Sequence, residues 1–239
     1  MKSRRNRLIK LSKKITGCDT IVTFEPENLY YLTGFWGEAI GITQKNGNTT
    51  IVAPELEVGR AKSESINCDV RKSERGYSAL SKITELIKGK KVCTDCQNYT
   101  AMESLKKSVP KIKQSSEPFY ATREIKDEKE IQILKNASKI IDQMFDLCVK
   151  KIKIGQKESE LQSILMSYAM KQGMFDTGYR STLNPLIIAG GPNGSLPHAQ
   201  VTNRKFSKVD LIVVDLFLLY NSDAAAAGVR VEHGGPQAH

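Results

Sequence analysis

The sequence predicts a small α/β domain followed by an α+β domain, and three observations support this. In the first half, short strand-like segments alternate with helix-like segments. A boundary falls near Pro118, where this alternation stops. After it come two long helix-like segments, over 123–151 and 158–171, and then two strand-like segments separated by a loop rich in glycine, proline and asparagine. We therefore divide the chain into domains at 1–118 and 119–239.

The elements of the first domain follow from its turn and cap residues. Residues 19–24, with the sequence DTIVTF, predict a strand, and Pro26 then begins a helical turn that Gly34 ends. The dipeptide Asn46-Gly47 is a strong turn signal and predicts a hairpin. The hairpin strands are expected over 39–43 and 50–52, further helices over 54–65, 79–88 and 100–107, and further strands over 91–93 and near Ile112.

The second domain begins with a long helix whose apolar residues form a rough stripe along one side. Another helix follows Gly155. Strand-like segments over 186–189 and 211–219 then flank the loop 190–197. From residue 223 the composition changes, because the tail DAAAAGVRVEHGGPQAH contains no lysine. We interpret residues 223–239 as an atypical end of the chain.

Composition places the chain among ordinary globular proteins. Apolar residues make up 40% and charged residues 26%, which excludes collagen-like and wholly disordered chains. No apolar run approaches the roughly 18 residues that a membrane-spanning helix needs. We therefore expect no membrane partner.

The opening stretch is basic: seven of the first fourteen residues are lysine or arginine and none is acidic, in a chain with a net charge of +10. Such a stretch can bind nucleic acid or an anionic membrane surface. It can also be the solvated face of a helix whose Leu8, Leu11 and Ile15 pack inward. We favour the helix, because no aromatic residue alternates with the basic ones as stacking on bases requires. Nucleic acid is therefore not an expected partner.

The cysteines indicate a reducing compartment. There are five, an odd number at wide spacing, and no apolar signal segment precedes them, so we expect the protein to be cytoplasmic. Cys93 and Cys96 form a C-x-x-C pair, which can be a redox pair or half of a zinc site. A structural zinc needs two further soft ligands, yet no histidine precedes His198. We therefore favour no metal or redox role for the pair.

The residues that can carry chemistry lie between 184 and 223. Asp215 lies within an apolar strand-like segment, where burying a carboxylate is costly unless a metal or a cation compensates it. Asp223 follows after a turn, and two carboxylates brought together by a hairpin can hold divalent ions. His198 lies at the end of the glycine-rich loop. The alternatives are an ion pair between Asp215 and a lysine or arginine, and a loop histidine hydrogen-bonded to the backbone.

Five segments, in order along the chain, resemble the pita-bread metallopeptidases, the group of Xaa-Pro aminopeptidases, prolidases, methionine aminopeptidases and creatinase. NLYYLTGF at 28–35 is similar to the amino-terminal domain of creatinase and prolidase relatives. REIKDEKEI at 123–131 is similar to the entry of their catalytic domain, and GQKESE at 155–160 to the next helix start. Pro197-His198-Ala199 and the VVDL of 213–216 follow, with Arg204 between them. The NLYYLTGF segment favours the Xaa-Pro branch.

The resemblance implies an α/β creatinase-like domain followed by a pita-bread domain with a metal-dependent exopeptidase activity, which hydrolyses the peptide bond before proline. Two divalent ions, of manganese, cobalt, zinc or iron, share a water in the family and lower its pKa. Asp215 and Asp223 match the metal-binding aspartates. His198 matches the histidine that helps to stabilise the tetrahedral intermediate. Short proline-containing peptides are the implied substrates, of the aminopeptidase or dipeptidase type, and a homodimer is the implied assembly.

The segment after Asp215 departs from the family's pattern. Asp223 follows after only eight positions, and Ala224 and Ala225 stand where a Thr-Arg pair is usual. The family's later histidine and two glutamate ligands have no counterpart within a family motif. We therefore expect an incomplete pita-bread domain that is inactive as this chain stands. The alternatives are a non-catalytic pita-bread module that binds peptide, protein or nucleic acid and, ranked last, metal-independent creatinase-like amidinohydrolysis.

Overall fold

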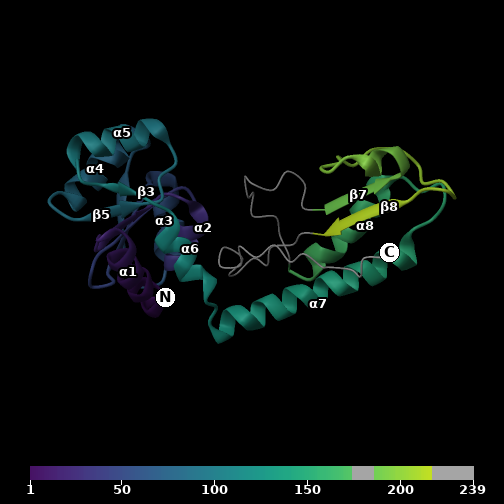
Figure 1. Ribbon diagram of the computed structural model, residues 1–239, viewed down its shortest axis with the longest axis horizontal. Coiled ribbons are helices and arrows are strands. Elements are labelled where there is room, and N and C mark those ends of the chain that lie inside the picture. Colours follow the sequence, from purple (N-terminus) through teal and green to yellow (C-terminus); the bar gives the residue numbers. More distant parts are fainter. Residues whose placement is uncertain (174–185, 217–239) are drawn as a thin grey trace. The chain divides into compact units, whose positions relative to one another are not determined.

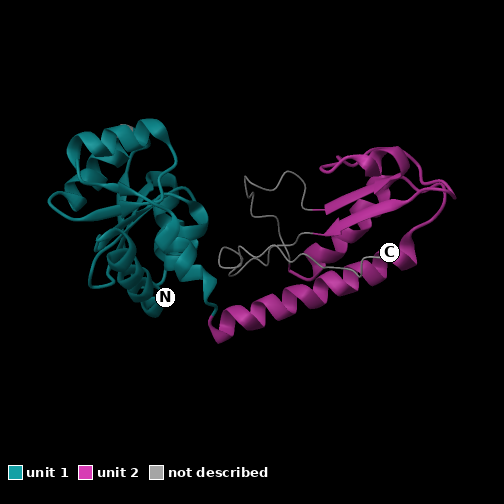
Figure 2. Cartoon of the chain, viewed as in Figure 1, with its two compact units in different colours: residues 1–126, 228–239 teal, residues 127–227 magenta. Residues whose placement is uncertain are grey.

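The computed structural model describes residues 1–173 and 186–216, and it separates the chain into two compact units (Figure 2). The first unit runs from Met1 to Lys126, and the second begins at Asp127. The first is an α/β domain and the second combines helices with a strand pair, as the sequence predicts. Within the two described ranges, none of the helices combines the length and the apolarity that crossing a bilayer demands.

A six-stranded mixed sheet forms the centre of the first unit, with the order β4-β3-β2-β1-β5-β6 (Figure 1). Neighbouring strands among β1, β2 and β3 are antiparallel, whereas β4 runs parallel to β3 and the pairs β1–β5 and β5–β6 are also parallel. The strands are β1 (Thr20–Thr23), β2 (Ile40–Thr43), β3 (Thr49–Pro54), β4 (Cys68–Ser73), β5 (Val92–Thr94) and β6 (Lys113–Gln114).

Helices cover both faces of this sheet. Ile83 of α4 packs in one core with Val52 of β3. The next residue back along the strand, Ile51, points to the other face, where it packs with Leu29 of α2 and Ala61 of α3. The helices are α1 (Lys2–Thr16), α2 (Pro26–Thr33), α3 (Glu55–Glu64), α4 (Tyr77–Ile87), α5 (Tyr99–Ser108) and α6 (Glu117–Glu124).

The hairpin predicted around Asn46-Gly47 is confirmed as the connection between β2 and β3. Gly47 has a φ of +80°, a conformation that side chains other than glycine's rarely adopt. A Cβ atom at this position would also lie 2.6 Å from Oδ1 of Asn6. Beside the turn, the hydroxyl groups of Thr43 and Thr49 form a 3.0 Å hydrogen bond across the two strands.

The basic residues of α1 are not all on a solvated face. Arg4 and Arg5 lie on the buried side of the helix. The Arg5 guanidinium donates hydrogen bonds to the carbonyl oxygens of Leu32, Ile66 and Asn67, at 2.8, 2.6 and 2.9 Å. The solvated-face interpretation is therefore wrong for these two arginines. Arg5 instead joins α1 to the end of α2 and to the segment that precedes β4.

The boundary between the units lies further along the chain than Pro118. Helix α6 packs against α1, so the first unit extends to Lys126. The single helix expected over 123–151 is divided, because α7 (Glu128–Lys151) begins only after Asp127. The Asp127 carboxylate accepts a 2.9 Å bond from the backbone amide of Glu130, and the Glu130 carboxylate accepts one from the amide of Asp127. This capping box fixes the start of α7.

In the second unit, α7 and α8 (Glu158–Lys171) supply the core against an antiparallel pair, β7 (Leu186–Gly190) and β8 (Ile212–Leu216), with the short 3-10 helix η1 (Gly191–Ser195) after β7 (Figure 1). The core contains Met144 of α7, Leu165 of α8 and Ile188 of β7. All of them are at most 1% exposed. The strand expected over 211–219 is described over 212–216, and Asp223 lies outside the described residues.

Candidate active site

Asp215 lies on the face of the β7–β8 pair that is turned away from α8. It is directly opposite Ile187 in the antiparallel register. Residues opposite one another in such a pair point to the same face, and so do residues two apart along a strand. Ala189 and Val213, which are also opposite one another, therefore share this face. The alternate residues of both strands belong to the core with α8.

The expectation that Asp215 is buried within an apolar strand is wrong. The residues of β8 alternate between half-buried and exposed, and Asp215 is exposed. The reason is that α7 and α8 form a core on only one face of the strand pair. The ion-pair alternative finds no support either, since within 1–173 and 186–216 no cationic side chain pairs with Asp215. The carboxylate is free to meet a ligand from solvent.

The Pro197-His198-Ala199 segment lies on the same face as Asp215. Ala199 is 1% exposed and packs with Ile187 and Ala189. His198 itself is exposed. The backbone that carries the imidazole therefore crosses the Asp215 face of the strands, and the imidazole is accessible to solvent. The sequence order alone could not place these two residues on one face.

Glu158, the first residue of α8, holds the loop that bears His198. Its carboxylate is fully buried. It accepts hydrogen bonds from the Gly190 amide (2.8 Å), the Asn193 side-chain amide (2.8 Å), and both the amide (3.0 Å) and the hydroxyl (2.6 Å) of Thr202. Burial alone would raise the pKa of Glu158, but these hydrogen bonds outweigh it and lower the pKa. The sequence marked GQKESE only as a helix start and gave no sign that this carboxylate is buried.

Arg204, which is also part of the family resemblance, forms an ion pair in the part of the loop that leads back to β8. Its guanidinium forms two bonds, of 2.6 and 2.7 Å, with the carboxylate of Asp210. Hydrogen bonds from Arg204 and from the amide of Ser207 hold the pKa of Asp210 well below its ordinary value. A Cβ atom at Gly191 would lie 2.6 Å from Oδ1 of Asp210 and 2.7 Å from a guanidinium nitrogen. Glycine is therefore needed where η1 passes this ion pair.

The described residues supply one candidate metal ligand, Asp215. In the part of the chain that the structure describes, no group of three or more histidine, cysteine, aspartate or glutamate side chains is placed to hold a metal ion. Asp223, the second predicted ligand, lies outside those residues. A dinuclear centre is thus not completed by the residues on the β7–β8 face.

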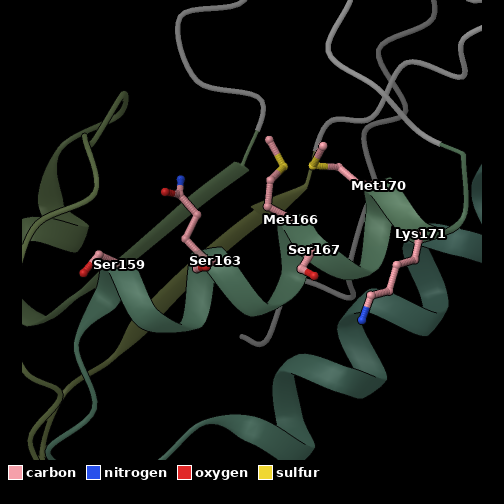
Figure 3. Close-up of a pocket in the computed structure, with 7 residues that line it drawn as sticks. Ser159, Ser163, Met166, Ser167, Met170 and Lys171 are labelled. Carbon is pink, nitrogen blue, oxygen red and sulfur yellow. The ribbon is translucent and has the colours of Figure 1, made fainter.

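A groove of about 780 Å³ runs along α8 and is lined by its serines, methionines and Lys171 (Figure 3). Helix α8 packs against the other face of the strand pair from Asp215, through Leu161 and Leu165. The groove and the candidate catalytic residues are therefore on different sides of β7 and β8. It is not part of the candidate active site.

The C-x-x-C pair lies inside the first unit. Cys93 and Cys96 are buried free thiols. Burial, and then the neighbouring Cys18, raise the pKa of the Cys93 thiol to about 11. Since the thiolate is the form that binds metals and attacks disulfides, this environment suits neither role.

Comparison with known proteins identifies the two domains. Residues 4–125 match the creatinase/prolidase N-terminal domain family, and residues 132–237 match metallopeptidase family M24. The chain is 31% identical over 232 residues to the Xaa-Pro dipeptidase of Pyrococcus horikoshii, covering 93% of this chain and 63% of the relative. It is 28% identical to the Xaa-Pro dipeptidase of Pyrococcus furiosus, covering 92% and 62%.

The fold agrees with these matches. The crystal structure of the Pyrococcus horikoshii prolidase superimposes with a TM-score of 0.75 at 26% identity, over 91% of this chain and 61% of that structure. The chain thus spans a little over three fifths of the length of these relatives. The matched segments include four of the five motifs on which the resemblance was based, whereas REIKDEKEI at 123–131 lies mostly between the two segments. The chain therefore belongs to the M24 metallopeptidases that carry a creatinase/prolidase-type amino-terminal domain.

Proposed function

We propose that the protein functions as a metal-dependent exopeptidase that hydrolyses the peptide bond before proline, of the Xaa-Pro dipeptidase or aminopeptidase type. The observation that carries this proposal is the placement of Asp215 and the His198 segment on the same face of β7 and β8. In a chain of the M24 family, an exposed carboxylate without a cationic neighbour among the described residues is suited to bind a divalent ion.

The proposed roles divide between binding and polarisation. Asp215 would ligate a divalent ion of manganese, cobalt, zinc or iron, and Asp223, outside the described residues, is the proposed second ligand. Such ions supply Lewis acidity and an activated water when bound. His198 would donate a hydrogen bond to the oxygen of the scissile carbonyl and so stabilise the tetrahedral intermediate. Its exposure leaves the imidazole accessible to a peptide.

Metal binding is the direct test, because the chain spans only part of the length of its relatives. We expect titration calorimetry with Mn²⁺ to show stoichiometric binding, and Asp215→Asn to weaken it by on the order of tenfold or more, since a ligand carboxylate is lost. Asp142→Asn is the matched control, because Asp142 is an exposed aspartate on α7. Equal Mn²⁺ affinity for the wild type and for Asp215→Asn would remove Asp215 from the site.

Hydrolysis is the second readout. An Xaa-Pro dipeptide and the same dipeptide with alanine in place of proline should be assayed with and without Mn²⁺, Co²⁺ and Zn²⁺. In a chain of the relatives' full length, the proposal expects metal-dependent cleavage of the proline peptide that His198→Ala reduces. Cleavage that persists in excess chelator, or that does not distinguish the two peptides, would contradict it.

The alternative is a non-catalytic module that binds peptide, protein or nucleic acid. It is favoured by the single candidate ligand among the described residues and by the net charge of +10. It predicts no stoichiometric metal binding in the same calorimetry. A nucleic-acid affinity that falls steeply with salt would support its nucleic-acid form. The burial of Arg4 and Arg5 reduces the basic surface available for such binding.

The assembly and the compartment complete the proposal. We expect a homodimer, which sedimentation equilibrium would test. All five cysteines are free thiols in the structure, and four of them are buried. Free thiols suit a reducing compartment, which supports a cytoplasmic location.

A further inference from the structure

Residues 190–202, the first part of the connection between β7 and β8, are anchored at both ends by one buried side chain. The Oε1 atom of Glu158 accepts the amide of Gly190, at the end of β7. The Oε2 atom accepts three donors: the side chain of Asn193, in η1, and the amide and hydroxyl groups of Thr202. The residues between Gly190 and Thr202 include His198. A single carboxylate therefore fixes where the His198 segment leaves and rejoins the rest of the unit.

Backbone hydrogen bonds add to this anchor on the returning side of the loop. The amide of Glu158 donates to the carbonyl oxygen of Arg204 at 3.0 Å, and the amide of Ser159 donates to that of Thr202 at 3.1 Å. Phe206 and Gln156 are joined in the same way at 2.9 Å. The segment 202–206 thus lies alongside the start of α8. The anchor reaches a rigid element, since α8 packs in the core through Leu161 and Leu165.

The anchored loop lies over the face of the strands that carries Asp215. Ala199, next to His198, packs on Ile187 and Ala189 of that face. At the other end of the loop, a Cβ atom at Gly194 would lie 3.4 Å from Cγ2 of Val213, which shares the face with Asp215. Neither contact alone determines the path of the loop. The bonds of Glu158 at both ends hold the loop along the path on which Ala199 is buried.

We propose that Glu158 is the positioning residue of the His198 loop, holding residues 190–202 across the Asp215 face of β7 and β8. The catalytic meaning of this position rests on the function proposed above for His198 and Asp215. The anchoring itself does not, because it concerns only the path of the loop.

A carboxylate is needed for this role because all of its partners are donors. In Glu158→Gln, the amide nitrogen would replace either Oε1, where it would meet the Gly190 amide, or Oε2, where it would meet three donors. In both orientations at least one buried donor loses its acceptor. The isosteric change therefore weakens the anchor without removing volume from the core. The position at the start of α8 also favours a negative charge.

The anchoring is tested by hydrogen exchange followed by mass spectrometry on the full chain. We expect Glu158→Gln to increase amide exchange over 190–204 by on the order of tenfold, while exchange in α7 stays as in the wild type. The matched control is Glu160→Gln, because Glu160 is exposed and its carboxylate accepts, among the described residues, only the amide of Lys157 at the same helix start. Unchanged exchange over 190–204, or an equal increase throughout 127–173, would overturn the proposal.

A second pair of variants keeps the test decisive if Glu158→Gln does not fold. Thr202→Val removes the hydroxyl donor and keeps the shape, whereas Thr202→Ser keeps the donor. The proposal expects faster loop exchange in Thr202→Val and near wild-type exchange in Thr202→Ser. Equal exchange in the two variants would contradict it.

The position of His198 relative to Asp215 has its own spectroscopic readout. Mn²⁺ bound at Asp215 should broaden the imidazole resonance of His198, assigned with His198→Gln, and Glu158→Gln should reduce this broadening although the metal still binds. A loss of stability alone would not separate the two effects in this way. If Mn²⁺ does not bind at all, the proposed metal function fails, and the exchange measurements still decide whether Glu158 anchors the loop.

Discussion

The side-chain amide of Asn28 donates a 2.7 Å hydrogen bond to the carboxylate of Asp95, which lies just after β5 and is fully buried. The same carboxylate accepts the backbone amide of Phe24 at 2.6 Å, immediately before α2. Asn28, the first residue of the NLYYLTGF segment, therefore joins the start of α2 to the residue that follows β5 inside the first unit. This part of the family resemblance has a structural cause.

The Asp95 carboxylate makes the stability of the first unit dependent on pH. Burial raises its pKa from 3.8 to about 7, although the hydrogen bonds from Phe24 and Asn28 partly oppose the rise. Between about pH 4 and about pH 7, the Asp95 carboxyl group therefore keeps its proton in the folded state, whereas the unfolded chain has already released it. The stability due to this proton is present below that range and is lost as the pH rises through it.

Asp95→Asn should therefore flatten the pH dependence of unfolding. The free energy of unfolding should fall less between about pH 5 and about pH 8 in the variant than in the wild type. Trp36, the one tryptophan of the sequence, lies in the first unit, so urea unfolding can be followed by its fluorescence. Glu85→Gln, at an exposed position on α4, is the control. A variant that keeps the full wild-type difference would show that another group titrates.

Arg5 is expected to be the basic residue of α1 on which stability depends. Arg5→Met keeps the apolar part of the side chain but leaves the carbonyl oxygens of Leu32, Ile66 and Asn67 without this donor. We expect a loss of about 2 kcal/mol, since the buried Leu32 carbonyl is left unsatisfied and the bonds to the part-buried Ile66 and Asn67 carbonyls are also lost. Trp36 fluorescence measures it. Lys10→Met, on the exposed side of the same helix, should change the free energy of unfolding by less than about 0.5 kcal/mol.

Leu165 should be central to the core of the second unit. It is fully buried between α8 and the strand pair. Leu165→Ala is expected to destabilise this unit by about 2–5 kcal/mol, through lost apolar burial and the cavity that remains. Hydrogen exchange in α7 and α8 reports the change. Ser163→Ala, at an exposed position of α8, should leave exchange there unchanged, and a comparable effect of both substitutions would argue against this core.

Thiol reactivity should follow burial. Cys68 is half-buried, whereas the other four cysteines are buried. Alkylation of the native protein near pH 8, followed by peptide mapping, should modify Cys68 first and Cys93 only after unfolding. The pKa of about 11 that burial imposes on Cys93 leaves little thiolate at that pH. Modification of Cys93 as fast as Cys68 would revive a redox role for the C-x-x-C pair.

Local features of the chain were predictable, and features that depend on distant partners were not. The hairpin follows from Asn46-Gly47 because the turn needs only its own residues. The break before α7 was also readable, since Asp127 and Glu130 have the spacing of a capping box. The apolar stripe over 123–151 does not show this break, and it led to the expectation of a single helix.

The exposure of Asp215 could not be predicted in the same way. An apolar strand covered by helices on both faces and one covered on a single face contain the same residue types. The sequence also gave no sign of the Glu158 anchor, because its donors lie 32 to 44 positions later in the chain. The face shared by Asp215 and the His198 segment depends on the register of β7 and β8, which the sequence leaves open.

Helix α8 has two structural roles. Its first residue secures the loop, and its apolar side fills the interior. A substitution that tilts or shifts α8 would therefore change the position of the His198 imidazole and also lower the melting temperature. We therefore expect amino-acid substitutions to be rare at the buried positions and in the first turn of α8, and more frequent at its exposed serines.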